Sequence, residues 1–285
     1  MQEVAIVGAA GKMGSWFMHH FSRRGFEVYV YDINKLRVRM PRNVKVKDNL
    51  DDCVRHADLV IVCVPLNITP SVVKDCASKM KDRAIIAEIS SVKKKTFEAL
   101  KKVPTTLTPL CIHPMFGPGA SDKTQARMLL VPVRNERNEL KITRAVFDNA
   151  RITVLPNAKQ HDKSMAVVLG LTYFVNIVFA RLLSLSDFSM LKQVSGTTFG
   201  LQSLISESIL RDDPELIIAL LQANTYTREY VMKYLKAATT LRRLVVSKDS
   251  SKVKEELRKT RLKLERSQDL QKSYKRMYDI IEGIK

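Results

Sequence analysis

Residues 1–156 alternate short apolar runs with amphipathic segments, which is the pattern of an α/β protein. The apolar run at residues 4–7 predicts a strand, and the amphipathic pattern of residues 12–24 predicts a helix after it. Further strands are expected at residues 26–31, 44–46, 58–64, 84–89, 110–112, 128–133 and 152–155, and further helices at residues 50–56, 70–80, 94–102 and 136–149. The alternation predicts a doubly wound, parallel sheet covered by helices.

After Pro156 the chain shows only helical patterns. We expect helices at residues 162–185, 189–194, 201–210, 214–246 and 252–285. Residues 164–180 carry no formal charge, but a membrane span needs about 20 residues, so we interpret this stretch as a buried helix and expect no membrane association. A helical domain this apolar is typical of a dimerisation and substrate domain, so we expect a homodimer. The predicted domains are residues 1–156 and 157–285.

A glycine-rich turn, Gly8-Ala-Ala-Gly11-Lys-Met-Gly14, joins the first predicted strand to the first helix, and the second strand ends at Asp32. Glycine lets a backbone approach a pyrophosphate, a helix N-terminus favours its negative charge, and a carboxylate at the strand tip accepts hydrogen bonds from a ribose. Together these features predict a Rossmann-type dinucleotide site. The expected cofactor-binding residues are Gly8, Ala10, Gly11, Lys12, Met13, Gly14, Asp32, Val64 and Pro65.

The identity of the dinucleotide depends on Asp32. Its carboxylate repels the 2′-phosphate of NADP, so the predicted cofactor is NAD. Lys35, Arg37 and Arg39 follow closely and leave NADP open as an alternative. The glycine spacing, G-x-x-G-x-x-G, is one residue longer than the commonest fingerprint, so the motif owes its specificity to the flanking strands and to Asp32.

Composition narrows the class of protein further. The chain has 285 residues, 45% of them hydrophobic and 27% charged, and the first predicted strand leaves no room for a signal peptide, so we expect a cytoplasmic globular protein. The four cysteines form no C-x-x-C pair and the histidines lack metal-ligand spacing, so no metal site is expected. The net charge of +19 comes from dispersed basic residues without a nucleic-acid-binding motif. We therefore expect an anionic small substrate or a heat-adapted surface, and no nucleic acid.

Ser91 and His113 each follow a predicted strand of the sheet. The carboxyl ends of these strands form the edge at which a bound nicotinamide would lie. A neutral imidazole there can accept a proton from a substrate hydroxyl whose carbon gives up hydride, and Ser91 can orient that hydroxyl or the imidazole. Structural roles stay open as alternatives: a satisfied buried group for His113, a helix N-cap for Ser91, and a cap of the first long helix for His161-Asp162.

Four motifs together resemble the prephenate dehydrogenases of tyrosine biosynthesis, a family that includes arogenate dehydrogenases. They are the GAAGKMG loop, Ser91-Val-Lys93, His113-Pro-Met-Phe-Gly-Pro and His161-Asp-Lys-Ser-Met-Ala166, in the same order over about residues 1–240. The resemblance implies a Rossmann domain followed by a helical dimerisation domain. It also implies NAD-dependent oxidative decarboxylation of prephenate to 4-hydroxyphenylpyruvate, with His113 accepting a hydrogen bond from the ring hydroxyl and Ser91 beside it.

The chain departs from this family at two positions. Ser208 stands where relatives have a substrate-clamping arginine, five residues ahead of an Asp-Pro pair, and Tyr173 stands where they have a pocket histidine. Ser208 cannot balance a carboxylate, so we expect a cation from Lys192, Arg211 or Arg228. Arg211 is favoured because it lies about one helical turn from Ser208. The expected substrate-binding residues are Ser91, His113, Tyr173, Ser208 and Arg211.

Two other functions stay open. A related β-hydroxyacid dehydrogenase of the 3-hydroxyisobutyrate type would use a lysine of the helical domain in a glycine-rich K-x-x-x-N setting, and neither Lys163 nor Lys192 has such surroundings. An inactive, NAD-sensing interaction protein would explain the missing arginine but not the intact Ser91 and His113.

Overall fold

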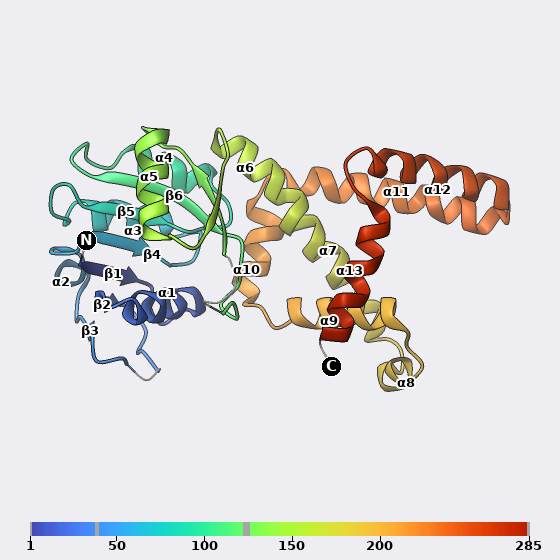
Figure 1. Cartoon of the computed structure of the whole chain (residues 1–285), viewed down its shortest axis with the longest axis horizontal. Coiled ribbons are helices and arrows are strands. Elements are labelled where there is room, and N and C mark those ends of the chain that lie inside the picture. The colour runs from blue at the N-terminus through green and yellow to red at the C-terminus, as the bar shows by residue number, and fades with distance from the viewer. Residues whose placement is uncertain (1, 38–39, 122–125, 284–285) are drawn as a thin grey trace. The chain divides into compact units, whose positions relative to one another are not determined.

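The computed structural model describes residues 2–37, 40–121 and 126–283 (Figure 1). The chain forms two compact units, Met1–Met165 and Ala166–Lys285. The boundary predicted from the sequence, between residues 156 and 157, lies nine residues ahead of this division. The first unit contains the sheet, and the described residues of the second form helices joined by short turns and loops, with no strand.

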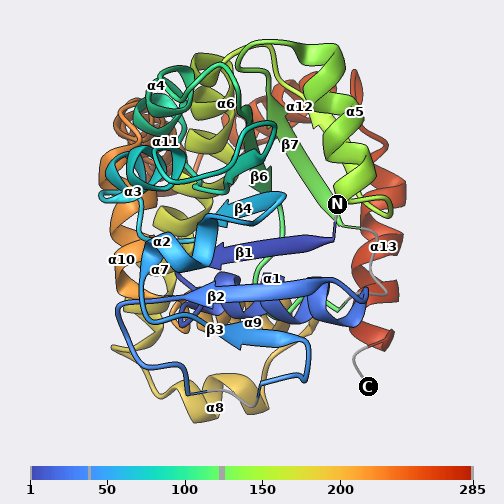
Figure 2. The same ribbon diagram turned by 90° about the vertical axis from the view of Figure 1, so that its left-hand side faces the viewer.

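An eight-stranded sheet forms the centre of the first unit. Its strands are β1 (Glu3–Val7), β2 (Glu27–Tyr31), β3 (Val44–Val46), β4 (Leu59–Val62), β5 (Ile85–Glu88), β6 (Thr108–Pro114), β7 (Arg127–Val131) and β8 (Arg151–Val154), in the order β3-β2-β1-β4-β5-β6-β7-β8. Figure 2 shows β3, β2, β1 and β4 side by side. All neighbours are parallel except β6 and β7, which are antiparallel. The predicted doubly wound fold is confirmed, and the antiparallel pair was not predicted.

Helices cover both faces of this sheet. They are α1 (Lys12–Arg23), α2 (Leu50–Val54), α3 (Thr69–Ala77), α4 (Lys94–Lys101), α5 (Glu136–Val146) and α6 (Ala158–Met165). Val4 and Ile6 of β1 belong to a buried apolar cluster that includes residues of α1 and α5. Ala5 and Val7 alternate with them and belong to a second cluster, with residues of α2, α3 and α4. The central strands β1, β4 and β5 are thus buried on both faces, which explains their nearly continuous apolar runs in the sequence, whereas β3 and β8 at the edges of the sheet are partly exposed.

The strand order reverses between β1 and β4, because the chain adds β2 and β3 on one side of β1 and then crosses to the other. In open α/β sheets this reversal marks the crevice in which ligands bind, at the carboxyl ends of the strands. The loop after β1 begins at Gly8, and the loop after β4 contains Val64 and Pro65. Both were predicted to bind a dinucleotide, and the topology brings them to the same edge.

The second unit follows the helical prediction with two corrections. Its elements are η1 (Ala166–Leu171), α7 (Thr172–Leu183), α8 (Phe188–Gln193), α9 (Thr197–Ile209), α10 (Pro214–Ile218), η2 (Ala219–Ala223), α11 (Thr227–Ser247), α12 (Ser250–Glu265) and α13 (Leu270–Gly283). The single helix expected over 214–246 is interrupted at Asn224, whose side chain accepts a hydrogen bond from the backbone N–H of Tyr226. The single helix expected over 252–285 is two helices, because Asp269 caps the start of α13.

The long apolar helix is less buried than predicted. Residues Ala158–Leu183 form a helical stretch of 26 residues. Its most apolar window of 18 residues has a mean hydropathy of 2.0, and only 17% of that window is buried within the chain. The prediction of a buried helix is therefore wrong for a single chain. By length and composition alone the stretch could cross a membrane, but core helices of soluble proteins meet the same criterion. The expectation of no membrane association stays a prediction.

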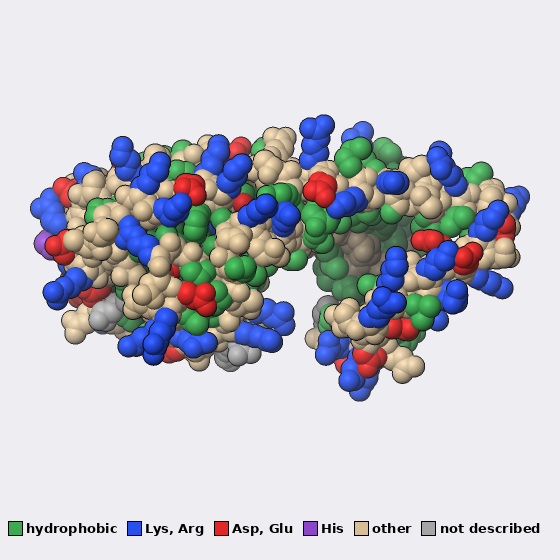
Figure 3. All heavy atoms as spheres, turned by 90° about the horizontal axis from the view of Figure 1, so that it is seen from above, with side chains coloured by type: hydrophobic (Ala, Val, Ile, Leu, Met, Phe, Trp, Pro, Cys, Tyr) green, Lys and Arg blue, Asp and Glu red, His purple; other side chains and the backbone are tan. Residues whose placement is uncertain are grey.

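The basic side chains are dispersed on the face that Figure 3 shows. Figure 3 shows Lys and Arg scattered over one face of the molecule and interspersed with Asp and Glu. Such an arrangement differs from the continuous basic stripe that is typical of nucleic-acid-binding proteins. The expectation of no nucleic-acid partner stays a prediction.

Candidate active site

The turn after β1 depends on two glycines. Gly8 has a φ of +90°, and a Cβ atom there would lie 2.5 Å from the carbonyl oxygen of Cys63. A Cβ on Gly14 would lie 2.1 Å from the carbonyl oxygen of Gly8. Both contacts are impossible for a larger residue without movement of the backbone. A Cβ on Gly11 would make only an ordinary contact of 3.4 Å with the carbonyl oxygen of Gly8. The conformation of the turn therefore does not require glycine at position 11.

Asp32 ties the end of β2 to this turn. Its Oδ2 accepts a hydrogen bond of 2.9 Å from the backbone N–H of Ala10, and its Oδ1 accepts one of 2.8 Å from that of Asn34. Each carboxylate oxygen keeps a further lone pair with which it could accept from a ribose hydroxyl. Lys35 and Arg37 are exposed, and Arg39 lies outside the described residues. The turn, the start of α1 at Lys12 and Asp32 thus fit a dinucleotide.

A fully buried ion pair joins β5 to β6. Lys93 Nζ lies 2.6 Å from Glu88 Oε1 and donates a second hydrogen bond of 2.6 Å to the carbonyl oxygen of Ile112, and the side chains of the pair are 0% exposed. Glu88 is paired with Cys111 in the sheet, and the Cys111 thiol donates to the same carboxylate at 3.1 Å. Lys93 therefore fixes the backbone of β6 directly before His113.

His113 begins a chain of hydrogen bonds that runs from β6 to α6. Its Nδ1 lies 3.0 Å from His161 Nε2, and His161 Nδ1 lies 2.8 Å from Asp162 Oδ1. Asp162 also accepts hydrogen bonds from the backbone N–H groups of Lys93 and Lys94, at 2.8 and 3.0 Å. Those two groups lie at the start of α4, so Asp162 caps α4. The alternative drawn from the sequence, that Asp162 caps the long helix to which it belongs, is wrong.

The surroundings keep both histidines neutral near pH 7. Burial and the charge of Lys93 hold the pKa of His113 well below its ordinary value of 6.5. Burial also lowers the pKa of His161, against the opposing effect of its hydrogen bond to Asp162. A neutral imidazole carries one N–H donor and one acceptor nitrogen, so His113 is suited to accept a hydrogen bond.

Ser91 is not bonded as the sequence suggested. It is half-buried in the loop after β5, and its hydroxyl makes no hydrogen bond to His113 or to any other group in the part of the chain that the structure describes. The N-cap alternative for Ser91 is also wrong, because the cap residue of α4 is Lys93 and the cap hydrogen bonds come from Asp162. The neighbouring Ser90 hydroxyl is the one that joins the network, donating to Glu88 at 2.5 Å.

The predicted substrate residues of the second unit have local partners. The Tyr173 hydroxyl donates to Asp212 Oδ2 at 2.6 Å, and burial and this carboxylate raise the pKa of Tyr173. Ser208 is exposed and donates to the carbonyl oxygen of Ile205 at 2.8 Å. Arg211 is exposed just beyond the end of α9. Among the other candidate cations, Lys192 is paired with Glu207 at 3.0 Å.

Sequence reasoning did not assign chemistry to Lys93, Glu88, His161 or Asp162. Lys93, His161 and Asp162 lie in the motifs that carry the family resemblance, and this position was the one sign in the sequence that they belong to the site. Their contacts join positions 48 and 69 residues apart, which periodicity cannot connect.

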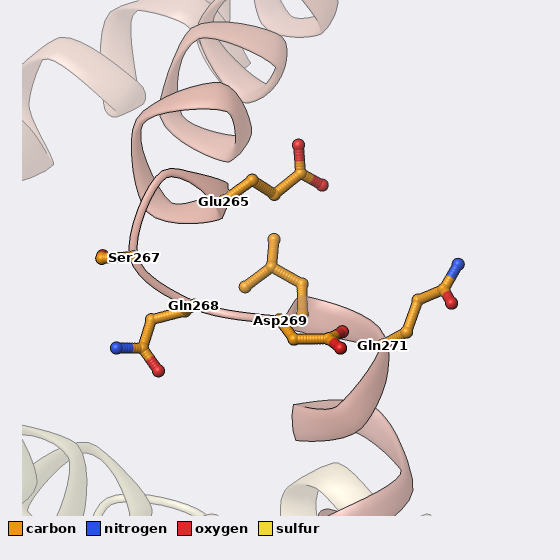
Figure 4. A pocket seen from close by; sticks show the side chains of 6 residues that line it. Glu265, Ser267, Gln268, Asp269 and Gln271 are labelled. Atoms are coloured by element: carbon orange, nitrogen blue, oxygen red, sulfur yellow. The ribbon is translucent and has the colours of Figure 1, made fainter.

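A separate hollow of about 490 Å³ lies at the turn between α12 and α13, lined by residues 265 and 267–271. Figure 4 shows Ser267 and Gln268 pointing to one side of the ribbon, and Glu265 and Gln271 to the other. The side chains do not converge on a common point. We therefore assign no function to this hollow.

Two domain families match the chain. Residues 19–136 match the nucleotide-binding domain of prephenate dehydrogenase, and residues 157–259 match its dimerization domain. The chain belongs to the prephenate dehydrogenase family. The order of the two matches is the one that the sequence motifs implied, and the second match ends within α12.

Curated relatives are similar over most of this chain. It is 27% identical over 256 residues to a probable arogenate/prephenate dehydrogenase of Methanocaldococcus jannaschii, which covers 86% of the chain and 57% of that protein. It is 26% identical over 223 residues to the T-protein of Haemophilus influenzae, which covers 76% of the chain and 55% of that protein. The chain thus spans little more than half the length of these relatives.

Solved structures of family members share the fold. A prephenate dehydrogenase of Aquifex aeolicus, solved with hydroxyphenyl propionate and NAD⁺, superimposes with a TM-score of 0.71 at 20% identity over 92% of this chain and 97% of that one. An arogenate dehydrogenase of Synechocystis gives a TM-score of 0.68 at 16% identity over 93% and 99%. The predicted fold class, a Rossmann-type sheet followed by a helical domain, is confirmed.

The buried ion pair generates a prediction about stability. Lys93→Met leaves the Glu88 carboxylate buried without its cation, so we expect the free energy of unfolding to fall by about 3–5 kcal/mol. Urea denaturation followed by circular dichroism measures it. Lys95→Met, at an exposed position of the same helix, is the matched control and should change stability by less than about 0.5 kcal/mol. Adding Glu88→Gln to Lys93→Met should recover part of the loss, and no recovery would mean that packing, not charge, explains it.

Proposed function

We propose that this protein is an NAD-dependent dehydrogenase that oxidatively decarboxylates prephenate to 4-hydroxyphenylpyruvate, as a cytoplasmic enzyme of tyrosine biosynthesis. The observation that carries the proposal is the buried, neutral His113, held at the carboxyl end of β6 by His161 and by the ion pair next to it. That edge of the sheet also holds the glycine turn. Membership of the prephenate dehydrogenase family supports the same reaction.

The residues of the first unit fit the cofactor. Glycine at positions 8, 11 and 14 leaves the backbone of the turn open to a diphosphate, and α1 offers its N-terminus. Asp32 would accept hydrogen bonds from the ribose, and Val64 and Pro65 would line the site beside the turn. NAD, when bound, supplies the acceptor for the hydride.

The catalytic role that we propose for His113 is to accept a hydrogen bond from the ring hydroxyl of the substrate. As hydride leaves the carbon that carries this hydroxyl, positive charge develops there, and a neutral imidazole stabilises it. The hydroxyl of Ser91, in the loop after the adjacent strand, would orient the substrate hydroxyl. Loss of carbon dioxide then yields an aromatic ring, so the protein mainly has to position and polarise the substrate.

Arogenate is a second candidate substrate. It carries an ammonium group on the side chain where prephenate carries a keto group. Ser208 offers no positive charge, and Tyr173 is bonded to the carboxylate of Asp212, which could hold an ammonium. Both acids carry a side-chain carboxylate, so a cation such as Arg211 would be needed with either; only the ammonium of arogenate could in addition pair with Asp212.

A turnover assay with NAD and each acid tests the proposal. Formation of NADH with prephenate, arogenate or both supports it, and the ratio of their kcat/KM values identifies the substrate. Activity with 3-hydroxyisobutyrate alone would favour the related β-hydroxyacid dehydrogenases. NAD binding without turnover of any of these acids would favour a sensing and interaction protein.

The role of His113 predicts the effect of His113→Asn. We expect kcat to fall by about 10²–10⁴-fold with little change in KM, because the variant replaces the basic imidazole nitrogen with a far less basic amide and leaves the other substrate contacts in place. Since the pKa of His113 lies well below 6.5, wild-type kcat should stay level as the pH drops to 6.5 and fall only in more acidic solution, as the imidazole becomes protonated. His56→Asn, at an exposed position, is the control. Near-wild-type turnover by the His113 variant would refute the role.

Asp32 predicts cofactor preference. We expect a higher kcat/KM with NAD than with NADP, because the carboxylate repels the 2′-phosphate. Asp32→Ser should bring the kcat/KM values for NAD and NADP closer together. Asp48→Ser, at an exposed aspartate of the same unit, should leave their ratio unchanged. A wild-type preference for NADP would contradict this assignment.

We propose that the second unit forms a homodimer, as its match to a dimerization domain and its exposed apolar side chains support. Leu182 and Leu185, at the end of α7 and just beyond it, are 59% and 80% exposed in the single chain. Sedimentation equilibrium at micromolar concentration should show a dimer, and Leu182→Glu should weaken it. Val46→Glu, at an exposed apolar residue of β3, should not. A wild-type monomer would count against the proposal.

A further inference from the structure

Asp162 can act only as an acceptor at its present place. Both of its carboxylate oxygens face backbone N–H groups, those of Lys93 and Lys94, and a backbone N–H cannot reverse its direction. The contact between Asp162 Oδ1 and His161 Nδ1 must therefore be an N–H donated by His161. The positive end of α4 further favours the charged carboxylate.

The direction of this hydrogen bond fixes the direction of the next one, between His161 and His113. A neutral His161 that is protonated on Nδ1 has a lone pair on Nε2, and that lone pair lies 3.0 Å from His113 Nδ1. His113 must then donate from Nδ1, which leaves its Nε2 unprotonated. Among the described residues, Lys93 and Glu88 are the other charged groups that act on the two rings. They are paired with one another, and neither is hydrogen-bonded to either imidazole.

We propose that Asp162 and His161 are positioning residues that hold His113 in the Nδ1–H tautomer, so that its Nε2 is the atom that accepts the hydrogen bond of the substrate hydroxyl. The catalytic part of this statement rests on the proposed function, whereas the tautomer is a property of the protein itself. Without His161, the imidazole of His113 is free to take the Nε2–H form that free histidine favours. That form would present a donor, and not an acceptor, to the substrate.

Nuclear magnetic resonance of the protein with ¹⁵N-labelled histidine tests the tautomer directly. At pH 7.5, about one unit above the ordinary histidine pKa, wild-type His113 should show a protonated Nδ1 and an unprotonated Nε2. His113→Asn assigns the signals. In His161→Phe the Nε2–H form of His113 should appear, whereas His161→Gln, whose amide oxygen can still accept from His113 Nδ1, should keep the wild-type tautomer. An Nε2–H form in the wild-type protein, or an unchanged tautomer in His161→Phe, would overturn the proposal.

Kinetics with the better substrate test the consequence. We expect His161→Phe to lower kcat by at least about 10²-fold at nearly constant KM, since a catalytic histidine in the wrong tautomer loses up to about 10⁴-fold in a comparable histidine–aspartate pair. His161→Gln should recover most of the loss, and His56→Phe should have no effect. Equal losses in the Phe and Gln variants would mark His161 as a packing residue and overturn the proposal. If the wild-type protein oxidises neither acid, the proposed function fails, and the resonance measurement still decides the tautomer.

Discussion

The ammonium group of Lys93 is the constraint around which the site of the first unit is built. A charge without access to water needs a partner and filled hydrogen-bonding positions, and Lys93 finds both in Glu88 and in the carbonyl oxygen of Ile112. Satisfying it fixes the ends of two neighbouring strands and the start of α4 relative to one another. These contacts also fix the position of His113, the next residue after Ile112.

The same charge determines what His113 can do. A cation in a buried environment disfavours a second one, so Lys93 helps to keep the imidazole neutral. On the other side of His113 the single carboxylate of Asp162 is occupied by two backbone N–H groups and by His161. The network therefore stabilises an uncharged histidine with a defined polarity, and it does so before any ligand arrives.

The sequence predicted those features whose causes are local. The turn from Gly8 to Gly14 was recognisable because the conformation and the close contacts demand glycine, and His113 because it ends a strand. His161 and Asp162 were underestimated because their partners lie far away along the chain. The interruption at Asn224 was missed for a different reason: a single side chain that bonds its own backbone is enough to end a helix whose apolar pattern continues.

In the proposed function, the hydride step and the choice of substrate acid depend on different parts of the chain. All residues that fix His113 lie within positions 1–165, and they agree with the family resemblance. Both departures from the family, Tyr173 and Ser208, lie in the second unit, where Tyr173 is bonded to Asp212. The hydrogen bonds described around His113 use no residue of that unit. Such independence would let one fold serve acids with different side chains.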